Sequence, residues 1–344
     1  MKSFTYIILL LLVGSCLPAE LDNIQAFEYS FPELEEVEEL PEVVVVTPTE
    51  ELPTEGDLIV TEKGEKLVVD VVEAVIDDNI SEENITIIES FAEVAPEVAD
   101  DYINTEVTNE WIEGIFNGDV APSQEFLQIQ EEFEDNEEFV AYLAQLEFPT
   151  VDGVIPGGRV NPSKVQYKPI SSPQNRLSSL VTPCKEAAEA LYLENLQNLE
   201  DQYQAQIDLV EAFYLNFPAD YELNSILRRA SFSEVLRSKT DEIKAFAFTF
   251  GSAIEALDYS DNIKRGLRIY LAVFVLSSRS QLLEWDLNYQ LAEDKALEKS
   301  LESVQNEKQA ALITAKNNYD LAVSLQEQIY NGAVDNCHNQ GAGG

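Results

Sequence analysis

The sequence predicts a mostly α-helical protein whose main part is an antiparallel, coiled-coil-like hairpin of two long helices carrying a helical head. From Leu267 to Asn331 the chain contains neither proline nor glycine. Apolar residues in this stretch recur at spacings of three, four and seven, a period of roughly 3.5 that predicts one apolar seam on a helix face. The seam consists of Leu297, Leu301, Val304, Ala311, Ala315, Ala322, Leu325 and Ile329.

A second long helix is expected to begin at Thr182-Pro183 and to end at about Asn216, before Pro218. Threonine is a favourable N-cap, and proline fits the first helical position. Its seam keeps a three-four alternation, which makes it the natural partner of the C-terminal helix. The seam positions are Leu193, Leu196, Glu200, Tyr203, Ile207, Val210, Tyr214 and Phe217.

Two of the three cysteines lie at the outer ends of this helical pair. If Cys184 faces Cys337, the antiparallel register brings residue 217 opposite residue 304 or so. We therefore predict a Cys184–Cys337 disulfide, which an oxidising compartment would allow to form. It would close a loop of 152 residues. In the chain-entropy model such a bond stabilises the fold by at most about 5 kcal/mol.

The head is expected between the two arms of the hairpin. Short helices are predicted at 219–229 and 233–237, a third from Thr240 to about Leu257, and the long return helix from Ser260-Asp261. Residues 245–250 and 269–276 are apolar on almost every face. Both runs are shorter than the roughly 20 residues that a membrane span needs. Burial inside a bundle is the favoured interpretation, and insertion into a bilayer is the alternative.

Residues 58–148 are predicted to form a small acidic helical unit. Ser81, Thr108 and Ser123 are each followed by acidic residues, as expected of helix N-caps. Residues 58–72 allow two interpretations. Leu58-Ile59-Val60 and Leu67-Val68-Val69 flank a turn and suggest a hairpin, whereas Val68, Val71, Val72 and Val75 make a helical stripe.

Two stretches are expected to lack regular structure. Residues 16–57 are acidic and punctuated by prolines, which predicts a disordered spacer, although the four valines 43–46 could pair as an edge strand. Residues 149–182 are rich in proline and glycine and are expected to be a linker. The stalk and head would then occupy residues 183–337, and residues 338–344 would form a flexible tail.

Acidic residues outnumber basic ones by 64 to 21, for a net charge of -43. The imbalance is concentrated in residues 1–150, which hold 38 acidic residues and three lysines. Such a surface repels nucleic acid and anionic lipid, so nucleic-acid binding is excluded as a function. Charged partners would be basic proteins or weakly held divalent cations.

Residues 1–16 have the proportions of a secretory signal: a lysine, a short apolar run and then small residues. The segment Val13-Gly14-Ser15-Cys16 resembles the lipobox of bacterial lipoprotein signal peptides. This resemblance implies removal of residues 1–15, attachment of acyl chains such as palmitate to Cys16, and an anchored rather than spanning protein in the cell envelope, at the outer membrane. The alternative is an ordinary signal peptide cleaved near Ala19.

The sequence contains no pattern of catalytic residues. His338 is the sole histidine and is expected in a glycine-rich tail, so neither a zinc cluster nor a Ser/His/Asp set is predicted. No cofactor is expected. No acidic run has the spacing of a calcium loop, although Asp77-Asp78 and residues 131–135 could hold divalent cations weakly.

The predicted function is therefore non-enzymatic: a lipid-anchored tether, scaffold or adhesin-like interaction module of the cell envelope. Two alternatives remain at this stage. The apolar head segments could insert into a target bilayer, or two of the many carboxylates could act as a hydrolase pair. The long seams could equally pair between subunits, which would make a homo-oligomer, and the sequence does not decide between this and pairing within the chain.

Overall fold

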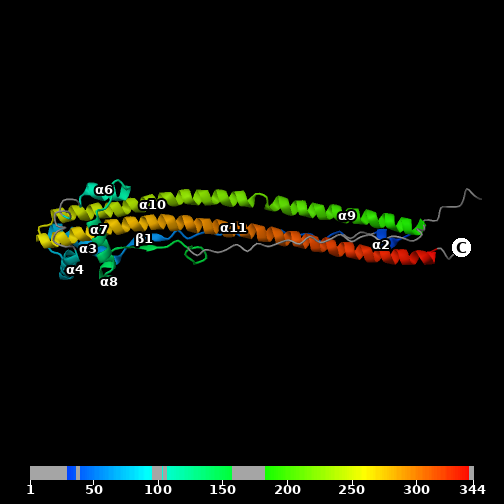
Figure 1. The fold of residues 1–344 in the computed structure, drawn as a ribbon, viewed down its shortest axis with the longest axis horizontal. Helices are drawn as coiled ribbons and strands as arrows, with labels where there is room; N and C mark the ends of the chain where they lie inside the picture. The colour runs from blue at the N-terminus through cyan, green and yellow to red at the C-terminus, as the bar shows by residue number, and fades with distance from the viewer. Residues whose placement is uncertain (1–28, 36–38, 95–102, 104–106, 157–182, 341–344) are drawn as a thin grey trace, which may run out of the picture. The chain divides into compact units, whose positions relative to one another are not determined.

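A computed structural model describes residues 29–35, 39–94, 103, 107–156 and 183–340. The described chain is mostly α-helical, which confirms the predicted fold class. It divides into two compact units. Unit 1 comprises Met1–Val44, Lys168–Val210 and Ala310–Gly344, and unit 2 comprises Val45–Tyr167 and Glu211–Gln309. Three helices dominate the fold: α9 (Pro183–Tyr214), α10 (Phe217–Ala256) and α11 (Asp261–Gln340). They are coloured from green to red in Figure 1.

Unit 1 is an antiparallel pair formed by α9 and the last part of α11. Its facing residues follow an eleven-residue repeat. A step of eleven residues toward the C-terminus along α9 corresponds to a step of eleven residues toward the N-terminus along α11. Tyr192 stacks on Tyr330 at 4.6 Å between ring centroids, and Tyr203 stacks on Tyr319 at 4.7 Å. Between these layers the Asn195 amide donates to Gln326 Oε1 at 3.3 Å.

The buried seams of the long helices repeat every eleven residues, and the predicted period of 3.5 is therefore wrong. Eleven residues make three turns, or about 3.67 residues per turn, which drifts away from a heptad within a few turns. Consequently Leu193 and Leu325, both assigned to the predicted seams, are exposed. The buried eleven-residue series are Ala188, Leu199, Val210, Tyr221, Phe232, Ile243 and Ile254 on α9 and α10, and Leu271, Leu282, Glu293, Val304, Ala315 and Gln326 on α11.

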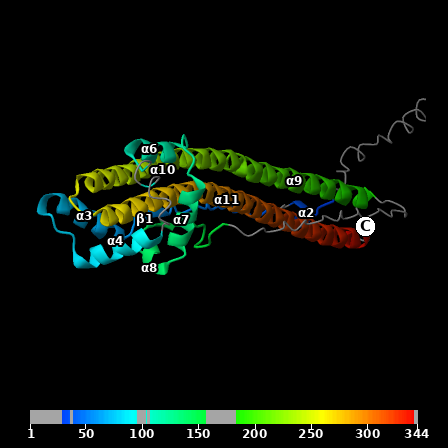
Figure 2. The ribbon, with the colours of Figure 1, turned by 60° about the vertical axis from the view of Figure 1, so that its left-hand side comes forward.

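Unit 2 surrounds the first half of α11 with α10 and a group of short helices. These are α3 (Glu62–Asp77), α4 (Glu82–Val94), α6 (Asn109–Asn117), α7 (Gln124–Glu134) and α8 (Glu137–Val140). Thr61, Thr108 and Ser123 cap α3, α6 and α7 by accepting a backbone N–H bond. Figure 2 shows these elements from a second direction.

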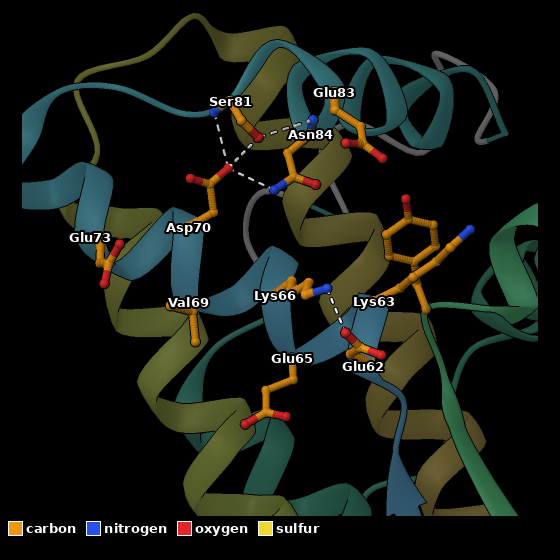
Figure 3. Close-up of a pocket in the computed structure, with 11 residues that line it drawn as sticks. Glu62, Lys63, Glu65, Lys66, Val69, Asp70, Glu73, Ser81, Glu83 and Asn84 are labelled. Atoms are coloured by element: carbon orange, nitrogen blue, oxygen red, sulfur yellow. Dashed lines mark hydrogen bonds and ion pairs between the residues drawn. The ribbon is translucent and has the colours of Figure 1, made fainter.

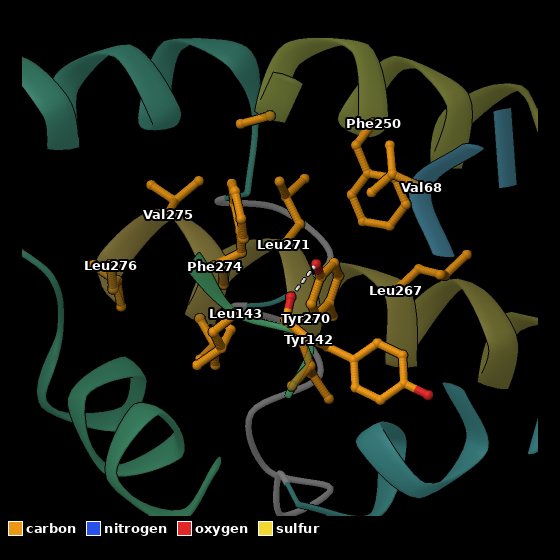
Figure 4. Packing of buried hydrophobic residues seen from close by; sticks show 14 of the residues in the cluster. Val68, Tyr142, Leu143, Phe250, Leu267, Tyr270, Leu271, Phe274, Val275 and Leu276 are labelled. Atoms are coloured by element: carbon orange, nitrogen blue, oxygen red, sulfur yellow. Dashed lines mark hydrogen bonds between the residues drawn. The ribbon is translucent and has the colours of Figure 1, made fainter. Parts of the chain in front are cut away.

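The short helices and the predicted head share one hydrophobic core, so they are not separate domains as the sequence suggested. Tyr270 lies at its centre (Figure 4). Its hydroxyl donates to the Tyr142 carbonyl at 2.9 Å, and its ring stacks on Phe91 at 5.5 Å. Close approach requires glycine at position 266, where a Cβ atom would lie 2.1 Å from the Ile88 carbonyl oxygen. Residues 269–276 are all buried here, as the favoured interpretation predicted.

Three local predictions differ from the structure. Strand β1 (Asp57–Val60) pairs antiparallel with β2 (Ala144–Glu147), with Asp57 opposite Glu147, and not with residues 67–69. Residues 62–77 instead form α3, following the helical stripe. The short helices predicted at 219–229, 233–237 and 240–257 are one continuous helix, α10, and α11 extends to Gln340, so residues 338–340 belong to it and not to a flexible tail.

The predicted disordered spacer is wrong for residues 29–35 and 39–57. Residues 32–35 form α2 (Pro32–Glu35), and residues 39–56 contain no helix or strand. We call residues 39–56 the strap. The remainder of the predicted spacer, residues 16–28 and 36–38, lies outside the described residues, as do the signal segment 1–15 and most of the predicted linker, residues 157–182. Val151, within that linker, is buried against Ala292 and Ala296.

Candidate functional site

The predicted disulfide partners lie together at one end of the α9–α11 pair in unit 1. Their sulfur atoms are 2.10 Å apart, and their Cα atoms are 5.9 Å apart. Phe31 and Leu34, from the α2 region, are buried against this cysteine pair and Ala188. The first described part of the chain is therefore packed on the disulfide. Cys16, the predicted lipidation residue, lies outside the described residues.

The strap is held by side chains of the long helices that bind its backbone. In unit 1, the Leu40 amide donates to Gln202 Oε1 at 2.8 Å, and the Pro41 carbonyl accepts from Gln206 at 2.9 Å and from Asn318 at 3.1 Å. These hydrogen bonds satisfy backbone groups of the strap, which belong to no helix or strand that could pair them.

In unit 2 the strap is bound in the same way. The Tyr214 hydroxyl donates to the Val46 carbonyl at 2.8 Å, and the Tyr221 hydroxyl donates to the Pro48 carbonyl at 2.7 Å. On α11, Ser300 Oγ accepts from the Glu51 amide at 2.8 Å. Trp285 Nε1 donates to the Glu55 carbonyl at 2.6 Å. In unit 2 the strap is thus held by side chains of the end of α9, of α10 and of α11.

A buried ion network fixes the strap to α10 and α11 within unit 2. Arg228 of α10 donates to Glu50 of the strap at 2.6 Å and to Glu293 of α11 at 2.7 Å. Ser225 Oγ and the Tyr289 hydroxyl also donate to Glu293, at 2.9 and 3.2 Å. Burial alone would lower the pKa of Arg228, but its hydrogen bonds to Glu293 and Glu50 outweigh burial, and the pKa is raised.

This network has the chemistry of a structural element. The Glu293 side chain is completely buried, and Arg228 forms an ion pair with the carboxylate of Glu293 and another with that of Glu50. Burial, followed by the charge of Glu293, raises the pKa of Tyr289, so that phenol stays protonated. Groups held in this way are poorly placed to exchange protons with a substrate, because a general acid or base must reach the reacting group.

An open acidic groove of about 530 Å³ lies between α3 and α4 of unit 2 (Figure 3). Five carboxylates and two lysines line it. Lys66 pairs with Glu62 at 2.6 Å, and Lys63 Nζ lies 5.4 Å from the centre of the Tyr142 ring. The lining residues are Glu62, Lys63, Glu65, Lys66, Val69, Asp70, Glu73, Ser81, Glu83, Asn84 and Tyr142.

Asp70 organises one end of the acidic groove. It accepts hydrogen bonds from the Ser81 hydroxyl at 2.7 Å, from the Ser81 amide at 3.0 Å and from the Asn84 amide group at 2.6 Å. Burial by itself would raise the pKa of Asp70, but the bonds from Asn84 and Ser81 prevail and the pKa is lowered. This arrangement joins the start of α4 to α3.

The groove and the acidic residues elsewhere can attract cations, yet no group of three or more potential ligands gathers to hold a metal ion among the described residues. Asp77-Asp78 ends α3, and residues 131–135 lie at the end of α7, so the two candidate cation segments belong to different helices. Position 338, expected in a loose tail, is part of α11.

Sequence reasoning missed the strap, the Arg228 network and the acidic groove. Polar residues at buried helix positions were the available signal for the first two, because Asn195, Ser225, Glu293 and Ser300 occur where the seams are otherwise apolar. A groove assembled from two helices has no such signal in the sequence.

Among the helices that the structure describes, none combines the length and the apolar character needed to cross a membrane. A scan of protein-family models, a search of curated proteins and a search of solved structures each returned no match.

Proposed function

We propose that this protein is a lipid-anchored tether of the bacterial cell envelope that acts as a non-enzymatic interaction module. Two features support the proposal: the lipobox-like residues Val13–Cys16, and the packing of Phe31 and Leu34 against the disulfide. The packing is the structural observation that carries it. Tyr29 is thirteen residues from Cys16. Since a residue spans at most about 3.5 Å, a lipid on Cys16 would lie within about 45 Å of the disulfide end of unit 1.

The order of the chain fits a tether. Leaving the anchor, the chain first packs in unit 1 and then continues as the strap into unit 2, bound throughout by side chains of the helices. Helix α11 alone has 80 residues. A bound strap and a long helix resist collapse better than a disordered acidic spacer would.

The surface of unit 2 supports an interaction role for basic partners. Its acidic groove carries five carboxylates against two lysines. A concave acidic surface attracts cationic side chains and speeds their association in a salt-dependent way. The alternative of bilayer insertion gains no support here, because the apolar segments that it requires, residues 245–250 and 269–276, contribute to the core of unit 2.

The test is fractionation of cells that produce the protein with Cys16→Ala. The intact protein is expected in the membrane fraction and to be released by detergent, whereas the variant is expected in the soluble fraction. The matched control replaces the other two cysteines with serine, which should leave membrane association intact. Equal membrane association of the Cys16→Ala variant would overturn the proposal.

A further inference from the structure

The acidic groove between α3 and α4 contains carboxylates that the folded chain already uses and carboxylates that it leaves open. Asp70 accepts hydrogen bonds from Ser81 and Asn84, and Glu62 pairs with Lys66 at 2.6 Å. The other three groove carboxylates have no ion pair and no side-chain hydrogen bond to any residue that the structure describes. They are Glu65, Glu73 and Glu83. Open carboxylates are common on a protein of net charge -43, so they indicate a binding site only together with another feature.

That feature is the phenol of Tyr142, which lines the acidic groove. Tyr142 is only 6% exposed, yet its hydroxyl makes no hydrogen bond to a described residue. In Figure 4 this hydroxyl points away from the core side chains drawn around it. Burial, followed by the charges of Glu83 and Glu138, raises the pKa of Tyr142, so the hydroxyl keeps its proton. A buried phenol normally finds a hydrogen-bond partner, and this one has a donor available to a ligand in the groove.

Lys63 lies beside this phenol. Its ammonium group is 5.4 Å from the centre of the Tyr142 ring and has no carboxylate within ion-pair distance among the described residues. The groove therefore presents two hydrogen-bond donors, the Tyr142 hydroxyl and the Lys63 ammonium group, together with three open carboxylates. A ligand that matches them must accept hydrogen bonds as well as carry positive charge.

This requirement separates the classes of cation that an acidic groove could bind. A polypeptide with basic side chains meets it, because its backbone carbonyls accept hydrogen bonds. A polyamine does not, because its protonated nitrogens are donors only. A metal ion is not favoured either, since no group of three or more potential ligands gathers in the part of the chain that the structure describes.

The spacing of the open carboxylates on α3 fits an extended chain. Glu65, Val69 and Glu73 follow one another at intervals of four, so they lie along one face of the helix. Figure 3 shows Val69 between the two carboxylates. At about 1.5 Å per residue, Glu65 and Glu73 are about 12 Å apart along the helix axis. Two lysines four positions apart in an extended peptide point to the same side and are about 13 Å apart. Val69 is 47% exposed and offers an apolar contact to the stems of such lysines.

We infer that the acidic groove binds an extended segment of a partner protein that carries two lysines four positions apart. The two lysine ammonium groups pair with Glu65 and Glu73 on α3, and Glu83 adds a third negative charge from α4. The backbone carbonyls of the segment accept hydrogen bonds from the Tyr142 hydroxyl and the Lys63 ammonium group. The inference rests on the proposed function for its role as an interaction site, whereas the chemistry of the groove does not depend on the lipid anchor.

The first test uses the full-length Cys16→Ala protein and a fluorescein-labelled peptide of serine and glycine with two lysines four positions apart. Fluorescence anisotropy at low salt measures the dissociation constant. Glu65→Gln combined with Glu73→Gln is expected to weaken binding about fivefold to tenfold, because two ion pairs are lost. The matched control combines Glu82→Gln with Glu89→Gln, which removes the same charge from exposed positions of α4 outside the groove and should weaken binding less than about twofold. No binding, or equal losses in the two variants, would overturn the proposal.

The second test separates a peptide site from the general attraction of cations to an acidic surface. Tyr142→Phe removes the hydroxyl without changing any charge, and it keeps the backbone carbonyl that accepts from Tyr270. Peptide binding is expected to weaken about fivefold, as for the loss of one hydrogen bond, with an unchanged circular dichroism spectrum. Spermine, which has no acceptor, is expected to bind wild type and Tyr142→Phe equally. Unchanged peptide binding by Tyr142→Phe, or spermine binding that falls by the same factor, would overturn the peptide as the ligand.

The third test concerns the spacing and uses a peptide of the same composition whose two lysines are adjacent. Adjacent side chains point to opposite sides of an extended chain, so weaker binding is expected. Equal affinity of the two peptides would contradict the match to Glu65 and Glu73. All three tests use protein without a lipid, so a failure of the anchoring proposal would be seen separately in the fractionation.

Discussion

Arg228 of α10 binds Glu293 of α11 with 2.7 Å between Nε and Oε1, and the Glu293 side chain has no exposed surface. The same guanidinium reaches Glu50 of the strap at 2.6 Å. One arginine thereby joins three segments that lie far apart in the sequence. A buried carboxylate of this kind is tolerated only while its cation is present.

Arg228→Ala is therefore expected to lower the free energy of unfolding by about 3–5 kcal/mol, because it leaves Glu293 buried without a cation. The neighbouring Arg229 is the control. It pairs with Asp294, which is 69% exposed, and its loss should cost less than about 1 kcal/mol. Urea unfolding of the two variants measures both values. Equal losses would mean that the Arg228 network has no special role.

The eleven-residue packing of unit 1 predicts a sharp difference between two nearby alanines. Ala188 is completely buried against the disulfide, whereas Ala190 is exposed on the same helix. Ala188→Leu should cost about 1–3 kcal/mol by overpacking, and Ala190→Leu should be nearly neutral. Thermal unfolding followed by circular dichroism reports the difference. If Ala190→Leu proved the more harmful change, the register of α9 would be wrong.

Replacement of both Cys184 and Cys337 by serine is expected to destabilise the protein by up to about 5 kcal/mol, since it releases a loop of 152 residues in the unfolded chain. Both tryptophans, Trp111 and Trp285, lie in unit 2. We expect helix loss by circular dichroism to begin at lower urea than the tryptophan fluorescence change, because the disulfide lies in unit 1. Coincident transitions at the wild-type midpoint would contradict this.

Asp70 predicts an acid-sensitive contribution to stability. Its pKa is lowered from the ordinary value of 3.8 by the bonds from Asn84 and Ser81. A carboxyl group with a lowered folded-state pKa stabilises the protein above its unfolded-state pKa, and this stability is lost as pH falls through the folded-state value. Asp70→Asn should therefore be less stable than wild type at pH 7. This difference in the free energy of unfolding should shrink below about pH 4.

The control for Asp70 is Glu73→Gln, an exposed change on the same helix. Urea unfolding of dilute protein at pH 7 and at pH 3 measures the difference in stability between each variant and the wild type. A gap for Asp70→Asn that is independent of pH, or one equally large for Glu73→Gln, would remove the role assigned to Asp70.

Much of the helical architecture follows from local signals. Thr182-Pro183 and Ser260-Asp261 correctly indicate where α9 and α11 begin, because capping and proline preferences act within one helical turn. The pairing of α9 with α11 follows from two long helices that must bury their seams. The period was misjudged because a few apolar residues fit heptad and eleven-residue repeats equally well, and Leu325 was assigned where Gln326 is buried.

The strap and the shared core could not be predicted in the same way. Strap residues bind side chains up to 277 positions away, as in the bond from the Asn318 side chain to the Pro41 carbonyl, so no local sequence pattern predicts them. Likewise, Tyr270 meets Tyr142 and Phe91 only after the chain has folded. The acidity of residues 16–57 resembles that of disordered segments, but composition does not reveal that tyrosines and serines elsewhere supply partners for the backbone.

The most direct test of the central claim is the intact mass of the protein purified from its membrane, before and after reduction. We predict a chain that begins at lipid-modified Cys16 and gains two hydrogens on reduction, as one Cys184–Cys337 bond requires. A chain without lipid, or a mass that reduction leaves unchanged, would contradict the tether and its disulfide-closed end.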